Sequence, residues 1–244
     1  MATTKFDVGG YEVAAEISGE GSPAVVFVSG AGAGKDSWDA AIAALRNSTT
    51  LLTYDRPGIG DSEIPADLSV RKVGAASEEL RRLLVATGLE GPVVLVGQSF
   101  GGLIALIYAA RWPVAGLVLV DTSDIHLNLD VDEPMLIAPD GERLSYDVVA
   151  SVDEVARSRR TLGVPSVVIA SRVSRWLDVV DLKRWRPFNL AELDERWQRH
   201  QESLAADLGA THKVARFAGH NIQNDDPAIV AASIDDLIEL ARGQ

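Results

Sequence analysis

Residues 93–110 read VVLVGQSFGGLIALIYAA, an apolar run, a short polar turn and a second apolar run. The first run has the length and the β-branched content of a strand covered on both faces, and the second has the length of a helix. Between them, Ser99 stands at the centre of a G-x-S-x-G pentapeptide at 97–101. Small residues on both sides let the strand and the helix lie close together, so the turn can project the serine hydroxyl from the edge of a sheet. The stretch therefore predicts a strand, a sharp turn and a helix, with Ser99 as a nucleophile at the turn.

Short strand-like runs alternate with helical patterns on both sides of this stretch. Such alternation is typical of parallel strands joined by crossover helices. An opening antiparallel pair is expected at 3–8 and 11–17. Further strands are expected at 24–29, 50–54, 92–97, 116–121, 165–170 and 212–217, and helices at 36–46, 68–87, 100–111 and 227–242. We therefore expect an α/β fold, a mostly parallel eight-stranded sheet with helices on both faces.

Two connections are longer than a simple crossover requires. They span residues 122–163 and 171–211, and each contains a helical pattern, at about 146–161 and 190–208. We expect these helical segments to cover another part of the molecule, which the sequence does not identify. The chain, residues 1–244, is expected to form one domain with a small lid inserted at about 122–163.

The composition narrows the possible partners. The chain has 244 residues, 47% of them hydrophobic, and no cysteine, so disulfides and thiolate-bound zinc are excluded. Its formal net charge of −12 opposes binding to the phosphates of nucleic acid or to an anionic membrane. The sequence does not open with a basic segment and an apolar run, and its longest apolar runs have strand length. We expect a cytoplasmic protein that acts on a small molecule and binds neither nucleic acid nor membrane.

Four blocks of sequence resemble the α/β-hydrolase superfamily, in the order found there. They are VVFVSGAGAG at 25–34, YDRPGIGDS at 54–62, VGQSFGG at 96–102 and AGHNIQNDDP at 218–227. The resemblance covers nearly the whole chain and implies the α/β-hydrolase fold. It implies a serine hydrolase with Ser99 as nucleophile, since haloalkane dehalogenases and epoxide hydrolases of this fold have aspartate at that position. In the second block, residues 55–58 look mainly structural and shape a loop beside the site.

The resemblance also implies two backbone N–H donors that stabilise an oxyanion. One belongs to Phe100, directly after the nucleophile, and the other to Ala31 in the glycine-rich loop at 29–32. Relatives usually begin this loop with histidine, whereas this chain has Ser29. Lys35 is wrongly placed for a Walker motif and no G-K-[ST] follows, so the loop does not predict phosphate binding.

A serine hydroxyl is a weak nucleophile and needs a base, which is normally histidine. The chain has four histidines: His126, His200, His212 and His220. His220 follows the last expected strand and precedes the C-terminal helix, which is the position of the base in the family. We expect His220 to be the general base and the other three to lie in the core, on the surface or along the pocket.

The carboxylate that orients the histidine is the point where this sequence departs from the family. Most relatives place it shortly after the strand expected at 165–170, but residues 170–174 read ASRVS. Other relatives place it at the end of the preceding strand, where this chain has Asp121 and then Asp124. Asp178 fits only if its loop is longer than usual. We choose Asp121, because catalytic groups gather at the carboxyl ends of parallel strands, and leave Asp124 and Asp178 open.

These residues predict acyl transfer to water through an acyl-enzyme on Ser99. The expected substrate is a small carboxylic ester, lactone or related compound, because the lid is short, and we expect no cofactor and no metal. Two alternatives remain, a cofactor-free lyase or oxygenase on the same fold and a non-catalytic small-molecule binder. Met135, Leu136, Trp176 and Trp185 are candidates for lining the pocket, and ordinary core packing explains them equally well. The sequence does not predict the oligomeric state.

Overall fold

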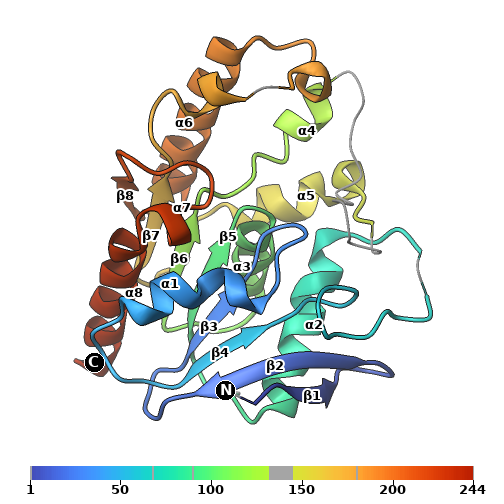
Figure 1. Ribbon diagram of the computed structural model, residues 1–244, viewed down its shortest axis with the longest axis vertical. Helices are drawn as coiled ribbons and strands as arrows, with labels where there is room; N and C mark the ends of the chain where they lie inside the picture. Colours follow the sequence, from blue (N-terminus) through green and yellow to red (C-terminus); the bar gives the residue numbers. More distant parts are fainter. Residues whose placement is uncertain (1, 68, 90, 132–144, 180, 244) are drawn as a thin grey trace.

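The computed structural model describes residues 2–67, 69–89, 91–131, 145–179 and 181–243. Its centre is an eight-stranded sheet with the order β1-β2-β4-β3-β5-β6-β7-β8 (Figure 1). The strands are β1 (Thr4–Asp7), β2 (Glu12–Ser18), β3 (Val25–Val28), β4 (Leu51–Tyr54), β5 (Val94–Gln98), β6 (Gly116–Val120), β7 (Ser166–Ala170) and β8 (Thr211–Val214). β2 pairs antiparallel with both β1 and β4, and the other neighbours pair parallel. The expected mostly parallel eight-stranded sheet is confirmed.

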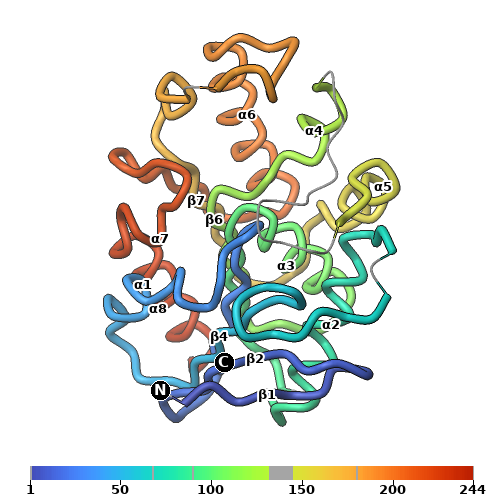
Figure 2. The backbone as a smooth tube through the Cα atoms, turned by 45° about the vertical axis from the view of Figure 1, so that its right-hand side comes forward, coloured from blue at the N-terminus to red at the C-terminus, as the bar shows by residue number. Residues whose placement is uncertain are grey.

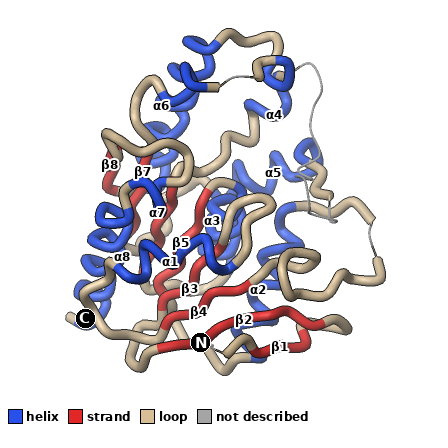
Figure 3. Tube along the Cα trace, viewed as in Figure 1, coloured by secondary structure: helices blue, strands red, loops and turns tan. Residues whose placement is uncertain are grey.

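Helices cover both faces of this sheet, as the alternation of elements predicts (Figure 3). On one face lie α1 (Asp39–Ala43), α7 (Ile222–Asp225) and α8 (Pro227–Arg242). On the other lie α2 (Val73–Ala86), α3 (Phe100–Arg111), α5 (Val148–Ser158) and the C-terminal part of α6 (Leu190–Leu208). Shorter elements are η1 (Lys35–Trp38), α4 (Leu127–Asp130), η2 (Arg175–Asp178) and η3 (Lys183–Trp185).

The central strands are mostly apolar because each face meets a helical layer. In β3, Val25 and Phe27 pack toward α1 and α8, whereas Val26 and Val28 pack toward α2 and α3. All four side chains are fully buried. Burying one such side chain contributes about 1.5–3 kcal/mol, so the two layers together fix the position of the strand ends.

A third, smaller apolar cluster lies beyond the carboxyl ends of the parallel strands. Its buried members are Leu127, Val131, Trp176, Leu193 and Trp197, from α4 and the residue that follows it, η2 and α6. In Figures 1 and 2, α4 and the N-terminal half of α6 stand over one end of the sheet, and both chain termini lie at the other end. This cluster therefore forms a roof over the edge of the sheet where active sites of α/β proteins occur.

The range 122–163, where a lid is predicted, contains two helices that pack in different places, α4 in the roof and α5 in the layer on the sheet. α5, which lies inside that range, packs on α2 and α3 in the layer that covers the sheet. Residues 132–144 lie outside the described residues. The side chains of the roof come from α4 and from the second long connection, residues 171–211, which contains η2 and α6. The extent of a lid within 122–163 stays a prediction.

Two of the element boundaries that differ from expectation have local reasons. The helix expected from residue 68 begins at Val73, because Arg71 forms a parallel bridge with Tyr146. The last strand ends at Val214, because a turn follows in which Ala218 N donates to Ala215 O at 3.1 Å. Across the described ranges, no helix combines the length and the apolar character that crossing a membrane requires.

Candidate active site

Ser99 occupies a strained turn between β5 and α3. Its backbone has φ 53° and ψ −119°, a conformation that costs a non-glycine residue about 1–3 kcal/mol. The turn is held by Ser99 N, which donates to Val120 O at 3.0 Å. A Cβ on Gly101 would lie 2.2 Å from Val28 O, so glycine is required there for the helix to approach the sheet. The strand, turn and helix predicted from residues 93–110 are thus present, with Ser99 at the apex.

Three of the predicted site residues come together at this point. Ser99 Oγ lies 2.9 Å from His220 Nε2, and His220 Nδ1 lies 2.6 Å from Asp121 Oδ2. A carboxylate only accepts, so Nδ1 carries the proton and donates to Asp121. Nε2 is then the acceptor for the Ser99 hydroxyl. This is the geometry of a nucleophile, a base and an orienting acid.

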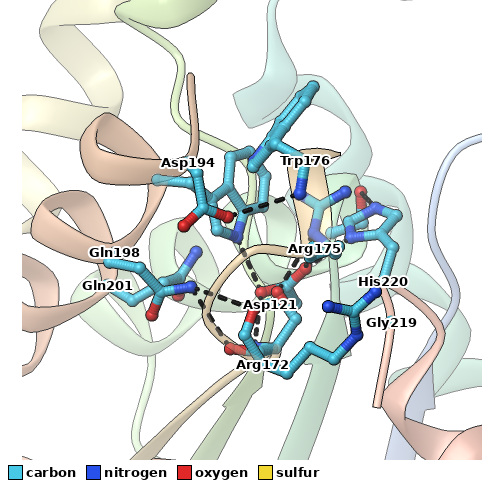
Figure 4. Close-up of polar contacts among 12 residues, drawn as sticks. Asp121, Arg172, Arg175, Trp176, Asp194, Gln198, Gln201, Gly219 and His220 are labelled. Carbon is cyan, nitrogen blue, oxygen red and sulfur yellow. Dashed lines mark hydrogen bonds and ion pairs between the residues drawn. The ribbon is translucent and has the colours of Figure 1, made fainter. Parts of the chain in front are cut away.

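Asp121 is fully buried directly after β6 and is surrounded by donors (Figure 4). Its Oδ1 accepts from Trp197 Nε1 at 2.7 Å and from Ser171 N at 2.9 Å, and Arg175 Nε lies 3.6 Å from Oδ2. Burial alone would raise the pKa of Asp121, but the hydrogen bond and charge of His220, aided by Arg175 and Trp197, hold it below its ordinary value. The carboxylate is therefore ionised at neutral pH.

The two carboxylates left open by the sequence have other partners. Asp124 Oδ2 lies 3.1 Å from Arg196 Nε, and its Oδ1 accepts from His126 N at 2.9 Å. Asp178 is exposed and pairs with Arg172. Neither Asp124 nor Asp178 forms a hydrogen bond with His220. The geometry therefore favours Asp121 as the carboxylate that orients the histidine.

The position after β7, where most relatives have the acid, is structural in this chain. Ser174 adopts a left-handed conformation with φ 70°, and its N–H donates to Asp194 Oδ2 at 2.8 Å. The second oxygen of Asp194 accepts from Trp176 N at 3.3 Å. Asp194 in α6 therefore fixes the start of η2 (Figure 4).

The two predicted oxyanion donors border the same pocket as Ser99. Phe100 is the first residue of α3, so its N–H is not used by the helix. Ala31 lies in a loop that is held at both ends. Ser29 Oγ donates to Gly34 O at 2.9 Å, and Arg56 Nη2 donates to Gly30 O at 2.8 Å. Ser29, which replaces the usual histidine, thus closes the loop; the role of the two N–H groups stays a prediction.

The loop that carries His220 is fixed by two further hydrogen bonds. Gln98 Nε2 donates to His220 O at 3.1 Å, and Gly219 N donates to Asp225 Oδ2 at 2.8 Å. The other histidines lie elsewhere: His126 is exposed beside α4, His200 is buried in α6 and His212 lies in β8.

The model of the alpha/beta hydrolase family matches residues 25–233. The chain belongs to this family. It is 25% identical over 229 residues to YqjL, an uncharacterized protein of Bacillus subtilis, covering 90% of this chain and 85% of that one. It is 38% identical over 105 residues to a putative carbamate hydrolase, RutD, of Klebsiella pneumoniae, covering 41% of this chain and 38% of that one. The crystal structure of a putative lipase of Acinetobacter baumannii has a TM-score of 0.70 at 18% identity, covering 100% of this chain and 93% of that one.

This member of the alpha/beta hydrolase family has a pocket of about 240 Å³ in front of Ser99 and His220. Trp176 and Trp185, named as candidates from the sequence, both line it. Met135 and Leu136 lie outside the described residues. The pocket is lined by Ala31, Ser99, Phe100, Ser123, Asp124, Leu127, Asn128, Arg175, Trp176, Val179, Arg184, Trp185, Trp197 and His220.

Sequence reasoning missed three side chains of this site. Ser123 Oγ lies 3.2 Å from Ser99 Oγ, and Trp197 and Arg175 both contact Asp121. Ser123 could have been expected at the site from the sequence, because it follows Asp121 by two residues after β6. Nothing local distinguishes Arg175 or Trp197 from surface residues of a charged segment. Among the described residues, no group of three or more metal-binding side chains is placed to hold an ion.

Proposed function

We propose that this family member is a serine hydrolase that cleaves a small carboxylic ester, lactone or related acyl compound through an acyl-enzyme. The observation that carries the proposal is the continuous hydrogen-bonded series from Ser99 Oγ through His220 to Asp121, at 2.9 and 2.6 Å. Ser99 is the nucleophile, His220 the general base and Asp121 the orienting acid. The N–H groups of Ala31 and Phe100 form the oxyanion hole.

In the first half-reaction, Ser99 Oγ attacks the acyl carbon and its proton passes to His220 Nε2. The carbonyl oxygen becomes an oxyanion, which accepts hydrogen bonds from the N–H groups of Ala31 and Phe100. His220 is then an imidazolium, and the buried carboxylate of Asp121 stabilises that charge. The imidazolium returns the proton to the leaving oxygen, the bond between that oxygen and the acyl carbon breaks, and the acyl group stays on Ser99.

In the second half-reaction, water replaces the alcohol. His220 Nε2 takes a proton from the water, whose oxygen attacks the acyl carbon of the ester on Ser99. The second tetrahedral intermediate collapses, the proton returns to Ser99 Oγ and the carboxylic acid leaves. The Ser123 hydroxyl, 3.2 Å away, is a second hydrogen-bond partner of Ser99 Oγ besides His220 and helps to orient it.

The size of the pocket supports a small acyl substrate. Ligand pockets usually measure about 300–1,000 Å³, and the pocket here, at about 240 Å³, lies below that range. The names of the similar proteins, a putative lipase and a putative carbamate hydrolase, suggest carboxylic esters and carbamates as acyl classes to compare.

A fluorophosphonate probe tests the nucleophile directly. The wild-type protein is expected to be labelled at Ser99, with no labelling in Ser99→Ala and much slower labelling in His220→Ala. Mass spectrometry of the labelled peptide identifies the modified residue. A folded wild-type protein that stays unlabelled would contradict the hydrolase and favour a non-catalytic binder. Labelling at Ser99 without turnover of any ester, lactone or carbamate would favour a lyase or oxygenase on this fold.

A further inference from the structure

The wall of the pocket contains a guanidinium group, that of Arg175, which takes no part in the proton transfers between Ser99 and His220. Its Nε donates to Ser171 Oγ at 3.1 Å and lies 3.6 Å from Asp121 Oδ2. Within the described ranges, its two Nη atoms have no hydrogen-bond acceptor. The side chain is 11% exposed and borders the pocket, so these N–H donors face the space where a substrate would lie.

Two tryptophans hold this guanidinium in place. Arg175 Cζ lies 4.4 Å from the ring centroid of Trp176 and 4.7 Å from that of Trp197. Both rings belong to the apolar roof, and Figure 4 shows Arg175 beside Trp176 and above Asp121. A planar cation stacked on aromatic faces has few accessible rotamers and little contact with water. Its hydrogen bonds to an anion are therefore stronger than those of a surface arginine.

Charged side chains of both signs lie around Arg175, and the nearby carboxylates of Asp121 and Asp194 both stabilise its charge. A second guanidinium, that of Arg184, also lines the pocket and lies 5.8 Å from the Trp185 ring centroid. The carboxylate of Asp124 lines it too, but Arg196 Nε is 3.1 Å from its Oδ2. Asp121 is shared between His220 and Arg175. The attraction for an anion therefore comes from the N–H donors of Arg175 itself and not from a net positive charge of the pocket.

We propose that the substrate carries a carboxylate in addition to its reacting acyl group, and that Arg175 binds this carboxylate. The proposal rests on the proposed hydrolase function and names its substrate class, a half-ester or related acyl derivative of a small dicarboxylic acid. The two parallel N–H donors of a guanidinium match the two oxygens of a carboxylate. A neutral ester without a second acid group has no carboxylate to fill this position. The small volume of the pocket favours a short chain between the two groups.

A pair of esters with four-carbon acyl chains tests this assignment. Monomethyl succinate carries the second carboxylate and methyl butyrate does not. In the wild-type protein, kcat/KM is expected to be at least about tenfold higher for monomethyl succinate, since a hydrogen bond to a charged group is worth that factor. In Arg175→Met, which keeps the aliphatic stem, the preference is expected to disappear. Both rates are expected to fall in this variant, because Arg175 also contacts Asp121, so the ratio of the two values is the measurement.

Two further variants separate charge from position. Arg175→Lys keeps the positive charge and is expected to retain part of the preference. Arg172→Met removes a nearby cation that pairs with the exposed Asp178 and does not line the pocket, so its ratio is expected to equal that of the wild type. If Arg175→Met slows both esters by the same factor, Arg175 only positions Asp121 and the proposal is wrong.

A binding measurement is independent of turnover. Calorimetry with succinate and Ser99→Ala is expected to detect binding that falls about tenfold or more in the double variant Ser99→Ala, Arg175→Met. Butyramide, which has a four-carbon chain and no carboxylate, is the control and is expected to show no difference between the two proteins. An enzyme that is labelled at Ser99 but shows neither the ester preference nor this binding difference would overturn the carboxylate assignment and leave the hydrolase standing. A protein that fails the labelling test but binds succinate through Arg175 would overturn the hydrolase function and leave the carboxylate-binding role of Arg175 standing.

Discussion

His220 Nδ1 lies 2.6 Å from Asp121 Oδ2, although 99 residues separate them, and Asp121 directly follows β6. Most relatives place the acid after the next strand in the sheet. Here β7 contributes a donor instead, since Ser171 N binds Asp121 Oδ1 at 2.9 Å. Because β6 and β7 are neighbours in the sheet, an acid at the end of either strand can reach the same histidine. The imidazole is oriented from a different strand by an equivalent hydrogen bond.

The first prediction concerns this carboxylate. Asp121→Asn keeps the shape of the side chain and removes its charge, so the imidazolium formed during catalysis loses its partner. We expect kcat/KM for an ester to fall about 10³–10⁴-fold, with Ser99 and His220 unchanged. Steady-state kinetics and circular dichroism of the purified variant measure the loss and check the fold.

The matched control is Asp178→Asn, which changes an exposed carboxylate paired with Arg172. We expect its kcat/KM to stay within about twofold of the wild type, because exposed ion pairs contribute little. A large loss of activity in Asp178→Asn together with an active Asp121→Asn would show that the acid has been assigned to the wrong residue.

The second prediction concerns the strain at Ser99. Ser99→Gly and Ser99→Ala both remove the hydroxyl and its hydrogen bond to His220, so they differ only in the Cβ and in the backbone conformations that it disfavours. Glycine adopts φ 53° without steric cost, whereas alanine does not. We expect Ser99→Gly to be more stable than Ser99→Ala by about 1 kcal/mol, after the larger chain entropy of unfolded glycine is subtracted. Urea unfolding compares the two, and an alanine variant as stable as the glycine variant would show that the turn is not strained.

The third prediction concerns the approach of α3 to β3. In Gly101→Ala, the new Cβ would lie 2.2 Å from Val28 O, a backbone atom that cannot move aside without shifting the strand. We expect a destabilisation of about 3 kcal/mol or more, or failure to fold. Gly91→Ala is the control, since a Cβ there meets nothing within 4 Å. Thermal unfolding of the two variants tests the difference, and equal melting temperatures would contradict it.

Features that depend on short stretches of sequence could be predicted. The apolar runs of the central strands predict burial on both faces, because every residue of such a strand meets a helix. Ser99 stands directly after β5 and His220 lies in the loop that follows β8, so their place at the carboxyl edge follows from the order of the elements. Asp121 could be chosen over Asp178 by the same reasoning, since it follows a strand without an intervening loop.

Features that depend on folding of the long connections could not be predicted. Trp197 reaches Asp121 across 76 residues, and Arg175 reaches it across a loop whose course is set by Asp194. These contacts depend on where α6 lies over the sheet, and a helical period fixes the face of a helix but not its position. The same limit applies to α5, because its helical pattern did not reveal that it packs on α2 and α3.

The fourth prediction concerns the dependence of stability on pH. Burial lowers the pKa of His200 to about 4. The charge of Asp124, whose Oδ1 lies 3.7 Å from His200 Nδ1, opposes this shift, whereas the charge of Arg159 reinforces it. The unfolded chain, with an ordinary histidine pKa near 6.5, therefore binds the proton first as the pH falls, and the free energy of unfolding falls between pH 6.5 and 4. From pH 7 to pH 5 this one group is expected to remove about 2 kcal/mol. His200→Gln cannot titrate, so its free energy of unfolding in urea should fall less than that of the wild type over the same interval. His212→Gln, which changes a histidine of β8, serves as the control, and the assignment is wrong if it flattens the pH dependence as much as His200→Gln does.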